Sequence, residues 1–375
     1  MLNSALLPHR AGLLPEDAVA RFSHLGVDLR VARQLIAAAV GRGEQGFEGV
    51  RGVRKTVLSA VEAASRAERL TVAAREDAAD GFRKYLFLLH DGEKVEAVRI
   101  PIPCEALGAD LSGFEGKEKK YIVCVSSQAG CALGCSFCAT GSLGFSRNLS
   151  ADEIVRQVLT VREEADRPVR GVVFMGMGEP FLNYEDVIRA AKILSHPSGG
   201  AIDARAITIS TAGIVPAIRR FTEEGHKFRL AVSLTQGDPA RRAPLMPVER
   251  IHPTPELVAA LHDHARTRRT RVLVEYVLLG GVNDGVDDAR ALIRLLDSRL
   301  VKIDVIDVNG DVGGYARSTP TARKAFFDTL AAGSMPFAVR YSGGQDVAAG
   351  CGQLAGGELG RAPKARLQVL HGLQA

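Results

Sequence analysis

The sequence has 375 residues, of which 46% are hydrophobic and 24% are charged, and its formal net charge is +5. This composition is typical of a soluble globular protein and excludes disordered and fibrous classes, while the length allows a barrel with an accessory domain. The N-terminal residues lack the apolar stretch of a signal peptide, no run reaches the length of a membrane span, and three of the six cysteines share one loop. We therefore expect a cytoplasmic protein with no membrane contact.

Residues 16–76 are predicted to be mainly helical. Hydrophobic residues recur at helical spacing in 17–40 and in 53–67, and a turn rich in glycine and arginine separates the two stretches at 41–46. Residues 1–76 hold eleven Lys and Arg against eight Asp and Glu, so much of the net charge lies here. We interpret 1–76 as a helical accessory domain whose surface is either simply solvated or binds RNA phosphates.

A β-hairpin is predicted next along the chain. Its strands are 83–89 and 95–100, and His90-Asp91-Gly92-Glu93-Lys94 joins them with the Asp-Gly pair that is typical of hairpin turns. A charged segment that contains glycine, 108–120, then follows as an exposed loop. We place a hairpin and linker at 77–120, bridging the accessory domain and a main domain at 121–375.

Strand patterns alternate with helical patterns throughout the main domain. The predicted strands are rich in β-branched residues and cover 121–126, 171–175, 206–210, 228–234, 272–279 and 301–308. The predicted helices cover 184–194, 214–224, 255–266 and 287–296, and a further helix begins at Ser150, with Glu153 as its capping partner. Repeated βα units require a parallel α/β sheet, open or closed into a barrel, with chemistry at the carboxyl ends of the strands.

A cluster of three cysteines, Cys131, Cys135 and Cys138, directly follows the first of these strands. A [4Fe–4S] cluster normally takes four thiolates, so three leave one iron open to a small molecule, for which S-adenosylmethionine is the usual candidate. The alternative is a zinc site with Cys124 or Cys104 as its fourth ligand, but zinc sites more often use paired Cys-x-x-Cys knuckles. The spacing favours the iron–sulfur cluster.

The second strand of the main domain leads into Met175-Gly176-Met177-Gly178-Glu179-Pro180. Taken alone, this segment is a glycine-rich turn into the next helix. Its glycines would also allow close approach to a ligand, and its carboxylate could take the ammonium group of S-adenosylmethionine. Because it lies one βα unit after the cysteine loop, we favour the ligand-binding interpretation.

Further segments carry a recognisable combination of motifs, which are 124–138, 144–150, 175–180, 275–278, 282–284 and 351–354, together with 80–87 near the hairpin. With them, the chain resembles the RlmN/Cfr family of radical S-adenosylmethionine RNA methyltransferases over almost its whole length. The resemblance implies a partial, TIM-like (β/α) barrel with an N-terminal accessory domain. It also implies a [4Fe–4S] cluster on Cys131, Cys135 and Cys138, with S-adenosylmethionine as cosubstrate.

The resemblance gives roles to three residues outside the cysteine loop. Cys351 would accept a methyl group from one S-adenosylmethionine, and a 5′-deoxyadenosyl radical from a second would activate that methyl group to add to an adenine carbon. Cys124 would release the product by forming a disulfide with Cys351, and Glu96 would act as the base. From the residues alone, both cysteines could instead be core thiols and Glu96 a surface carboxylate.

The resemblance also implies a set of contacts to S-adenosylmethionine, namely Gly178, Glu179, Ser210, Ser233, Leu234, Thr235 and Asn309. Two of these positions depart from the family pattern. Thr235 stands where the family has histidine, and Asn309 is followed by Gly310 where the family has proline. Both departures fall in loops that are expected to border the active site. They therefore affect the expected cofactor contact at position 235 and the identity of the substrate.

The implied substrate is an adenosine of 23S ribosomal RNA, methylated at C2, with a transfer-RNA adenosine as a further substrate and flavodoxin or ferredoxin as electron donor. Methylation at C8, or a paralogue with a different substrate, is the enzymatic alternative, and a non-catalytic iron–sulfur or zinc RNA-binding protein is the alternative of another class. Three basic stretches are candidates for phosphate contacts, at 51–55, 117–120 and 266–271. Aromatic residues make up only 5% of the chain and tryptophan is absent, so no base-stacking platform is visible.

Overall fold

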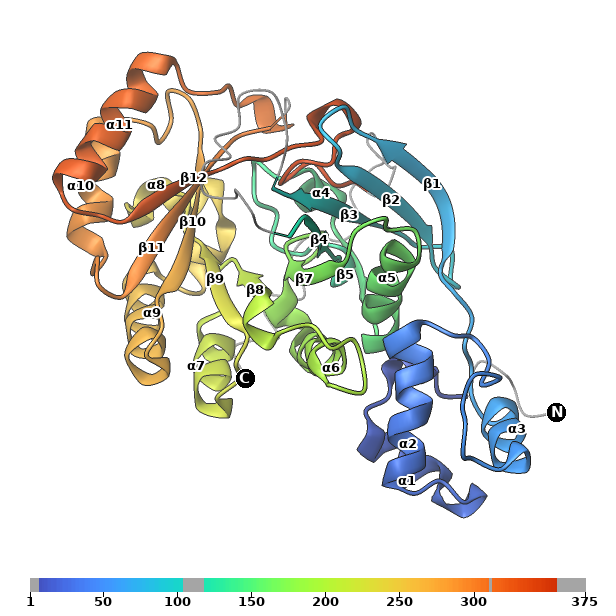
Figure 1. Cartoon of the computed structure of the whole chain (residues 1–375). Coiled ribbons are helices and arrows are strands. Elements are labelled where there is room, and N and C mark those ends of the chain that lie inside the picture. The colour runs from blue at the N-terminus through green and yellow to red at the C-terminus, as the bar shows by residue number, and fades with distance from the viewer. Residues whose placement is uncertain (1–6, 104–117, 310–311, 356–375) are drawn as a thin grey trace.

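The computed structural model describes residues 7–103, 118–309 and 312–355. Ten strands form its main sheet: β1 (Thr71–Asp77), β2 (Arg83–Leu88), β3 (Lys94–Ile102), β4 (Lys120–Cys124), β7 (Val169–Phe174), β8 (Ile207–Thr211), β9 (Arg229–Ser233), β10 (Val272–Leu278), β11 (Val301–Asp307) and β12 (Phe337–Arg340). They lie side by side in this order, so neighbours in the sheet are also neighbours in sequence (Figure 1). A separate antiparallel pair is formed by β5 (Gln128–Gly130) and β6 (Phe145–Asn148).

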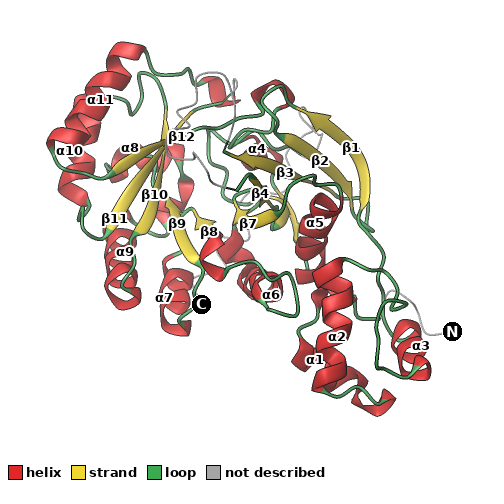
Figure 2. Ribbon diagram, in the orientation of Figure 1, coloured by secondary structure: helices red, strands yellow, loops and turns green. Residues whose placement is uncertain are grey.

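The main sheet has an antiparallel part and a parallel part. β1 to β4 pair antiparallel, whereas every pair from β4 to β12 is parallel. The parallel part requires crossover helices, which are α5 (Ala151–Glu163), α6 (Tyr184–Ser195), α7 (Val215–Glu224), α9 (Thr254–Arg268), α10 (Val286–Leu295) and α11 (Pro320–Ala332). Figure 2 shows these helices along the outside of the strands. The predicted α/β class with a parallel sheet is confirmed, and the described strands form an open sheet with edges at β1 and β12.

The N-terminal region is helical, as predicted, and contains α1 (Pro15–Phe22), α2 (Leu29–Ile36) and α3 (Lys55–Ala63). Gly26, with φ of 86°, separates α1 from α2, and α2 buries Val31 and Leu35 on one face. The helical prediction is wrong for the end of this region, because residues from Thr71 onward form β1. The strand lies on the sheet edge and is mostly exposed, so the burial pattern that marks a strand is missing. The division of the chain at 76 and 120 stays a prediction.

The parallel strands are buried on both faces and therefore read as nearly continuous apolar runs. In β10, Val272, Val274, Tyr276 and Leu278 are fully buried, and the buried Glu275 is the charged exception. The predicted start of α5 is also confirmed, because the backbone N–H of Ser150 donates to Glu153 Oε2 over 3.0 Å. These local signals placed the strands and helices around the cavity described below within a few residues.

Several short or peripheral elements were not predicted. They are β5, β6 and β12, the helices α4 (Ala139–Leu143) and α8 (Pro239–Leu245), and α11. The strand β12 has four residues and lies half-buried at the sheet edge, while α11 fully buries only Phe326 and Leu330. A short or weakly buried element shows little periodicity in its hydrophobic residues, so the sequence gave little indication of these helices and strands. Within the described residues, no helix combines the length and the hydrophobicity that crossing a bilayer requires.

The turn between β1 and β2 touches the segment that follows β12, so the two ends of the sheet meet. Asp80 Oδ2 accepts hydrogen bonds from Tyr341 Oη and from the backbone N–H of Gly344, both over 2.8 Å. Phe82 packs edge-on against Tyr341. At Gly343 a Cβ atom would lie 2.4 Å from the Phe82 ring, so this close approach requires glycine. The β1–β2 hairpin, whose turn contains Asp80, therefore holds the segment that leads to Cys351.

Candidate active site

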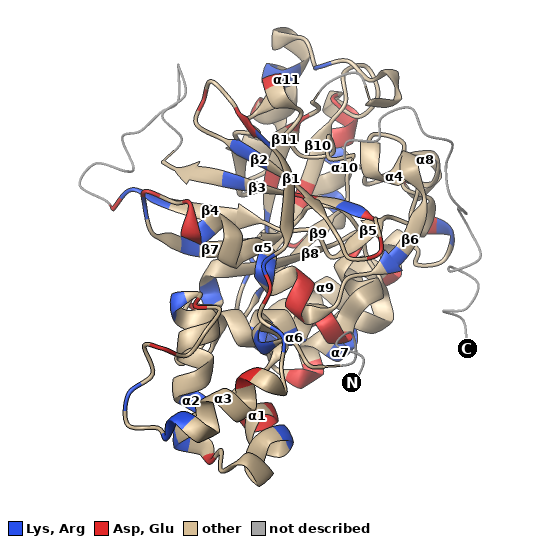
Figure 3. Cartoon of the chain, turned by 90° about the vertical axis from the view of Figure 1, so that its right-hand side faces the viewer, with Lys and Arg blue, Asp and Glu red and all other residues tan. Residues whose placement is uncertain are grey.

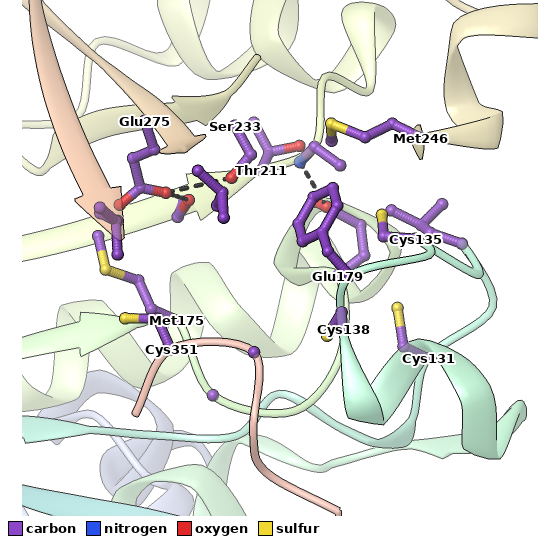
Figure 4. A pocket seen from close by; sticks show the side chains of 18 of the residues that line it. Cys131, Cys135, Cys138, Met175, Glu179, Thr211, Ser233, Met246, Glu275 and Cys351 are labelled. Atoms are coloured by element: carbon purple, nitrogen blue, oxygen red, sulfur yellow. Dashed lines mark hydrogen bonds between the residues drawn. The ribbon is translucent and has the colours of Figure 1, made fainter. Parts of the chain in front are cut away.

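One cavity lies at the carboxyl ends of the parallel strands, as the βα pattern predicts (Figure 4). Nine residues singled out from the sequence line it: Cys131, Cys135, Cys138, Gly178, Glu179, Ser210, Ser233, Asn309 and Cys351. Four others are absent from its lining: Cys124, Glu96, Leu234 and Thr235. Figure 4 shows Glu275, Met175 and Cys351 on one side of the cavity and Cys131 and Cys135 on the other, with Ser233 between them.

The three-cysteine loop is held by backbone hydrogen bonds. The N–H of Cys131 donates to Gly144 O over 2.8 Å, and the N–H of Cys138 donates to Cys135 O over 3.2 Å. Desolvation by burial raises the pKa of Cys131 well above its usual value and that of Cys135 to about 12, with each neighbouring thiolate adding to the effect. Thiolates crowded into such a buried site need a cationic partner, so the donor set fits a metal cluster.

The structure bears on the zinc alternative as well. Within the described residues, no three His, Cys, Asp or Glu side chains are close enough to hold a single metal ion. Three thiolates that bind three different irons are spaced more widely than ligands that share one ion. Cys124 is absent from the cavity lining, and its thiol interacts with Cys351 rather than with the cysteine loop. Cys104, the other candidate for a fourth ligand, lies outside the described residues.

Glu179 projects from the glycine-rich segment into the cavity wall. Its Oε2 accepts from the backbone N–H of Ala212 over 2.7 Å, and its Oε1 accepts from the N–H of Phe181 over 2.9 Å. Burial raises the pKa of Glu179 to about 7, because desolvation outweighs these hydrogen bonds. Gly178 has φ of 100°, and a Cβ atom there would lie 2.5 Å from Gln128 Cβ. This position therefore requires glycine, and a buried carboxylate of this kind fits a cationic ligand group.

Ser210 and Ser233, at the ends of β8 and β9, both donate to one carboxylate oxygen. Ser210 Oγ donates to Glu275 Oε2 over 2.6 Å and Ser233 Oγ donates to the same atom over 3.2 Å. The other oxygen, Glu275 Oε1, accepts from Arg340 Nη1 over 3.0 Å. Arg340 Nη1 also lies 3.3 Å from the sulfur of Met175. Ser210, Ser233, Glu275 and Met175 of this network line the cavity, and Arg340 lies behind them.

Leu234 and Thr235 lie behind this wall and are fully buried. The backbone N–H of Leu234 donates to Glu275 O over 2.9 Å, so the two residues brace β10. Thr235 has φ of 59°, which is unfavourable for a β-branched side chain, and its hydroxyl has no hydrogen-bond partner within the described part of the chain. Thr235 does not line the cavity, so its contact with S-adenosylmethionine stays a prediction.

The Cys351 turn is held from three sides. The N–H of Cys351 donates to Ser342 Oγ over 3.0 Å, and Asn309 Nδ2 donates to Cys351 O over 3.3 Å. On the third side, Gly352 O accepts from the N–H of Ala139, the residue after the last cysteine of the loop, over 2.7 Å. Asn309 Oδ1 is buried and has no partner among the described residues, so it can accept a hydrogen bond from a ligand.

Cys351 is close enough to Cys124 for its negative charge to disfavour ionisation of the Cys124 thiol. Burial is the main cause that raises the pKa of Cys124 to about 12, and the neighbouring Cys351 adds to it. Desolvation also raises the pKa of Cys351, which Arg340 opposes. Both thiols are free, and Cys351 is exposed as a residue whereas Cys124 is buried. The arrangement thus has one accessible thiol with a second, buried thiol near it.

Glu96 is buried on β3 beneath the C-terminal end of the described chain. Its Oε2 accepts from the backbone N–H of Ala355 over 2.7 Å, and its Oε1 lies 3.5 Å from Lys84 Nζ. It is therefore not a surface carboxylate. Because Ala355 follows Cys351 by four residues, Glu96 anchors the far side of the same loop.

Three residues of this site were missed as functional candidates, which are Glu275, Arg340 and Ser342. Glu275 was quoted only as part of a motif, although a carboxylate inside an otherwise apolar strand pattern is itself a signal for function. Arg340 and Ser342 are ordinary polar residues in sequence. Their importance comes from contacts with distant residues, so no local pattern could have identified them.

Comparison with known proteins places this site in a family. The model of the Radical SAM superfamily matches residues 125–296. A probable RNA methyltransferase of Myxococcus xanthus is 46% identical over 348 residues, which cover 92% of this chain and 93% of that protein. The dual-specificity RNA methyltransferase RlmN of Syntrophobacter fumaroxidans is 40% identical over 326 residues, or 86% of this chain and 91% of that protein.

A solved structure gives the same result. The crystal structure of a radical SAM methyltransferase from Sphaerobacter thermophilus matches with a TM-score of 0.83 and 35% identity, over 93% of this chain and 99% of that chain. Family membership confirms the expectation of an enzyme and implies a [4Fe–4S] cluster and S-adenosylmethionine; it leaves the non-catalytic alternative without support. The chain therefore belongs to the RlmN-like family of radical S-adenosylmethionine RNA methyltransferases.

Proposed function

We propose that the chain methylates a ring carbon of an RNA adenosine through a methylated Cys351. The observation that carries this proposal is the docking of the Cys351 turn onto the cysteine loop, through the 2.7 Å hydrogen bond from Ala139 N–H to Gly352 O. It places the Cys351 thiol in the cavity lined by the three cluster cysteines. The most favoured target is C2 of an adenosine in 23S ribosomal RNA, with a transfer-RNA adenosine as a second substrate.

When bound, the cluster and S-adenosylmethionine supply a methyl group and a 5′-deoxyadenosyl radical. Cys131, Cys135 and Cys138 would hold the cluster, and Glu179 would take the cationic amino group of the cosubstrate. Gly178, Ser210, Ser233 and Asn309 would surround the rest of it, while Leu234 and Thr235 support the wall behind. Cys351 would accept the methyl group by nucleophilic displacement, for which its thiol must first lose a proton.

Cys124 is the proposed resolving residue because its thiol interacts with Cys351 and, unlike the cysteines of the loop, does not line the cavity. After the carbon of the Cys351 methyl group has bonded to the adenine ring, the Cys124 sulfur would bond to the Cys351 sulfur. As this disulfide forms, the bond between the Cys351 sulfur and the former methyl carbon would break. Its electron pair would stay on the carbon, which then takes up a proton. A disulfide between Cys124 and Cys351 results, and an external thiol must reduce it before the next turnover.

Glu96 is the proposed base that removes a proton from the adenine carbon, and the unpaired electron left by the radical addition would return to the cluster held by the three cysteines. Its burial and its hydrogen bond to Ala355 N–H place it next to the loop that carries Cys351. Release of Ala355 by a movement of that loop would free one carboxylate oxygen for proton transfer. In this proposal, Glu96 can act as a base only when the loop that carries Cys351 has moved.

RNA would approach from the open side of the cavity, and a small electron-transfer protein such as flavodoxin or ferredoxin would supply electrons. Arg51, Arg54 and Lys55 are exposed on the N-terminal helical region and are the better candidates for phosphate contacts. The stretch 266–271 ends just before β10 starts, opposite the strand ends that form the cavity, and Lys117 of the third stretch lies outside the described residues. Figure 3 shows Lys and Arg interspersed with Asp and Glu over the N-terminal helices and β1–β4, which favours local contacts over one broad basic face.

The proposal is tested by incubating the cluster-loaded enzyme with S-adenosylmethionine, a reductant and either 23S ribosomal RNA or transfer RNA. We expect peptide mass spectrometry to find a methyl group on Cys351, and nucleoside analysis to find 2-methyladenosine. Cys351→Ala should give neither product, and Cys124→Ala should leave RNA attached to the protein. An unmethylated Cys351 in fully loaded enzyme would overturn the mechanism, 8-methyladenosine would correct the position, and methylated Cys351 with both RNAs unmodified would indicate a paralogue with another substrate.

A further inference from the structure

Glu275 is a charged residue of the cavity wall that has no role in the proposed mechanism. It lies in β10, its side chain is buried, and it faces the cavity together with Ser210 and Ser233. Ser233 is its direct neighbour across the β9–β10 pairing. A buried carboxylate is costly unless several donors satisfy it, and three side chains do so here.

The directions of these hydrogen bonds are fixed by the chemistry of the groups. The guanidinium of Arg340 has only donors, so Glu275 Oε1 is an acceptor and the positive charge balances the buried carboxylate. Oε2 accepts from both serine hydroxyls, over 2.6 and 3.2 Å. A hydroxyl has a single hydrogen to donate, and each serine donates it to Glu275. Neither serine can therefore donate a hydrogen bond to a ligand.

What remains on each serine oxygen is a lone pair, and both oxygens border the cavity. A ligand group with an N–H or O–H can donate to such an oxygen. A carboxylate or carbonyl group at the same place would meet a second acceptor and lose its hydration without compensation. The wall therefore discriminates by hydrogen-bond polarity and not only by shape.

We propose that Glu275 is a positioning residue that commits Ser210 and Ser233 to accepting hydrogen bonds, so that S-adenosylmethionine must present donor groups to this wall. The inference rests on the proposed function, because it takes the cosubstrate to lie against these two serines. Arg340 supports the arrangement by holding the other oxygen of Glu275. The cosubstrate has two kinds of donor left after Glu179 takes its amino group, namely the ribose hydroxyls and the adenine amine.

The test measures binding, not turnover, and uses S-adenosylhomocysteine as a probe because it has no methyl group to transfer. Equilibrium dialysis with cluster-loaded protein compares this probe with versions that lack the 2′-hydroxyl, the 3′-hydroxyl or the adenine amine. In the wild-type protein, the version that lacks the responsible donor should bind about tenfold more weakly. The identity of the weakly binding version shows whether the ribose or the adenine donates to the two serines.

The decisive variant is Glu275→Gln, which keeps the shape of the side chain and can turn its amide N–H toward a serine. Each serine can then donate to the cavity, so the complete probe should bind about tenfold more weakly, and deleting the responsible donor should cost almost nothing. Ser233→Ala removes one acceptor and should likewise shrink the cost of deleting that donor, which keeps the test valid if Glu275→Gln does not fold.

Asp304→Asn is the matched control, because Asp304 pairs with Glu275 across β10 and β11, is also buried, and does not line the cavity. It should leave all probe affinities within about twofold of the wild type. Equal losses for every probe in Glu275→Gln and Asp304→Asn would overturn the inference, as would an undiminished cost of donor deletion in Glu275→Gln. Failure of the proposed function looks different, since Cys351 would then stay unmethylated although the probe binds.

Discussion

The two ends of the cavity are built in different ways. At the cysteine-loop end, called the cluster end here, Cys131, Cys135 and Cys138 lie within eight residues, and the backbone N–H groups of Cys131 and Cys138 donate to residues at most thirteen positions away. At the opposite end, Cys351 is held through Ser342, Asn309 and Ala139, which come from three separate parts of the chain. One end is thus fixed locally, and the other is a docked segment whose position depends on remote side chains.

This difference separates two tasks that a radical enzyme must perform. The group that generates a radical has to stay where water and side reactions are excluded, which favours a rigid, buried loop. In the proposed mechanism, the residue that carries the methyl group has to meet the cosubstrate, the RNA base and then a second thiol. Docking through a few hydrogen bonds leaves the second end free to adjust its position at small energetic cost.

The largest effect should come from breaking one end completely. Cys138→Ala is expected to abolish RNA methylation together with cluster binding, because a local site cannot replace a ligand. Cys351→Ala should also abolish methylation but leave iron and sulfide per chain and the affinity for S-adenosylhomocysteine unchanged. Iron analysis, visible absorption and RNA mass spectrometry check both. Loss of iron in Cys351→Ala would mean that the two ends are not independent.

Buried side chains next to the cluster end should also contribute to the free energy of unfolding. Arg242 is completely buried, pairs with Glu249 over 2.6 Å and donates to Leu234 O and Ala212 O. Arg242→Met would leave the buried Glu249 without its positively charged partner, so we expect a loss of about 3–5 kcal/mol in the free energy of unfolding. Arg241→Met is the matched control. Its half-exposed pair with Asp288 should be worth about 1 kcal/mol or less in urea unfolding.

Glu179 gives the same end a dependence on pH in the cofactor-free protein. Burial raises its pKa from the ordinary 4.5 to about 7, so between these values the folded state binds more protons than the unfolded state. Stability must then fall as pH rises through this window and stay low above it, by up to roughly 3 kcal/mol. Urea unfolding of the wild type and Glu179→Gln at pH 5 and pH 8 should show the wild type losing stability relative to the variant. A constant difference between them would refute this.

The smallest effect should come from loosening the docked end. Asp80→Ala removes the acceptor for Tyr341 Oη and Gly344 N–H, so amide hydrogen exchange should accelerate in 341–351. The methylated fraction of Cys351 should fall about threefold to tenfold, with cluster content unchanged. Asp77→Ala, which removes a carboxylate that binds Arg83 on the same hairpin, should change neither quantity. If both variants behave alike, the hairpin and not Asp80 holds the segment.

Sequence reasoning was most successful where a property repeats locally. The parallel strands follow from apolar runs between turn formers, α5 from its capping pair, and the cysteine loop from its spacing. Nine of the predicted site residues then line one cavity, because the carboxyl ends of parallel strands converge. Their individual roles stay predictions, which the experiments above test.

What the sequence could not reveal are the features that depend on distant partners. The edge strands β1 and β12 are exposed or short, so neither leaves a clear periodic pattern. Arg340 acquires its meaning only through Glu275, and Ser342 only through Cys351. No spacing rule predicts that the hairpin turn at Asp80 reaches a segment 264 residues away.

That last contact has a consequence for how the protein is made. During synthesis the N-terminal hairpin and the cysteine loop leave the ribosome well before Cys351, and the hydrogen bonds of Asp80 can form only after residue 344 has emerged. Closing so long a loop is entropically costly and therefore comes late. The nascent chain thus completes the cluster loop before it acquires the cysteine on which the proposed methyl transfer depends, and a truncated chain lacks that cysteine altogether.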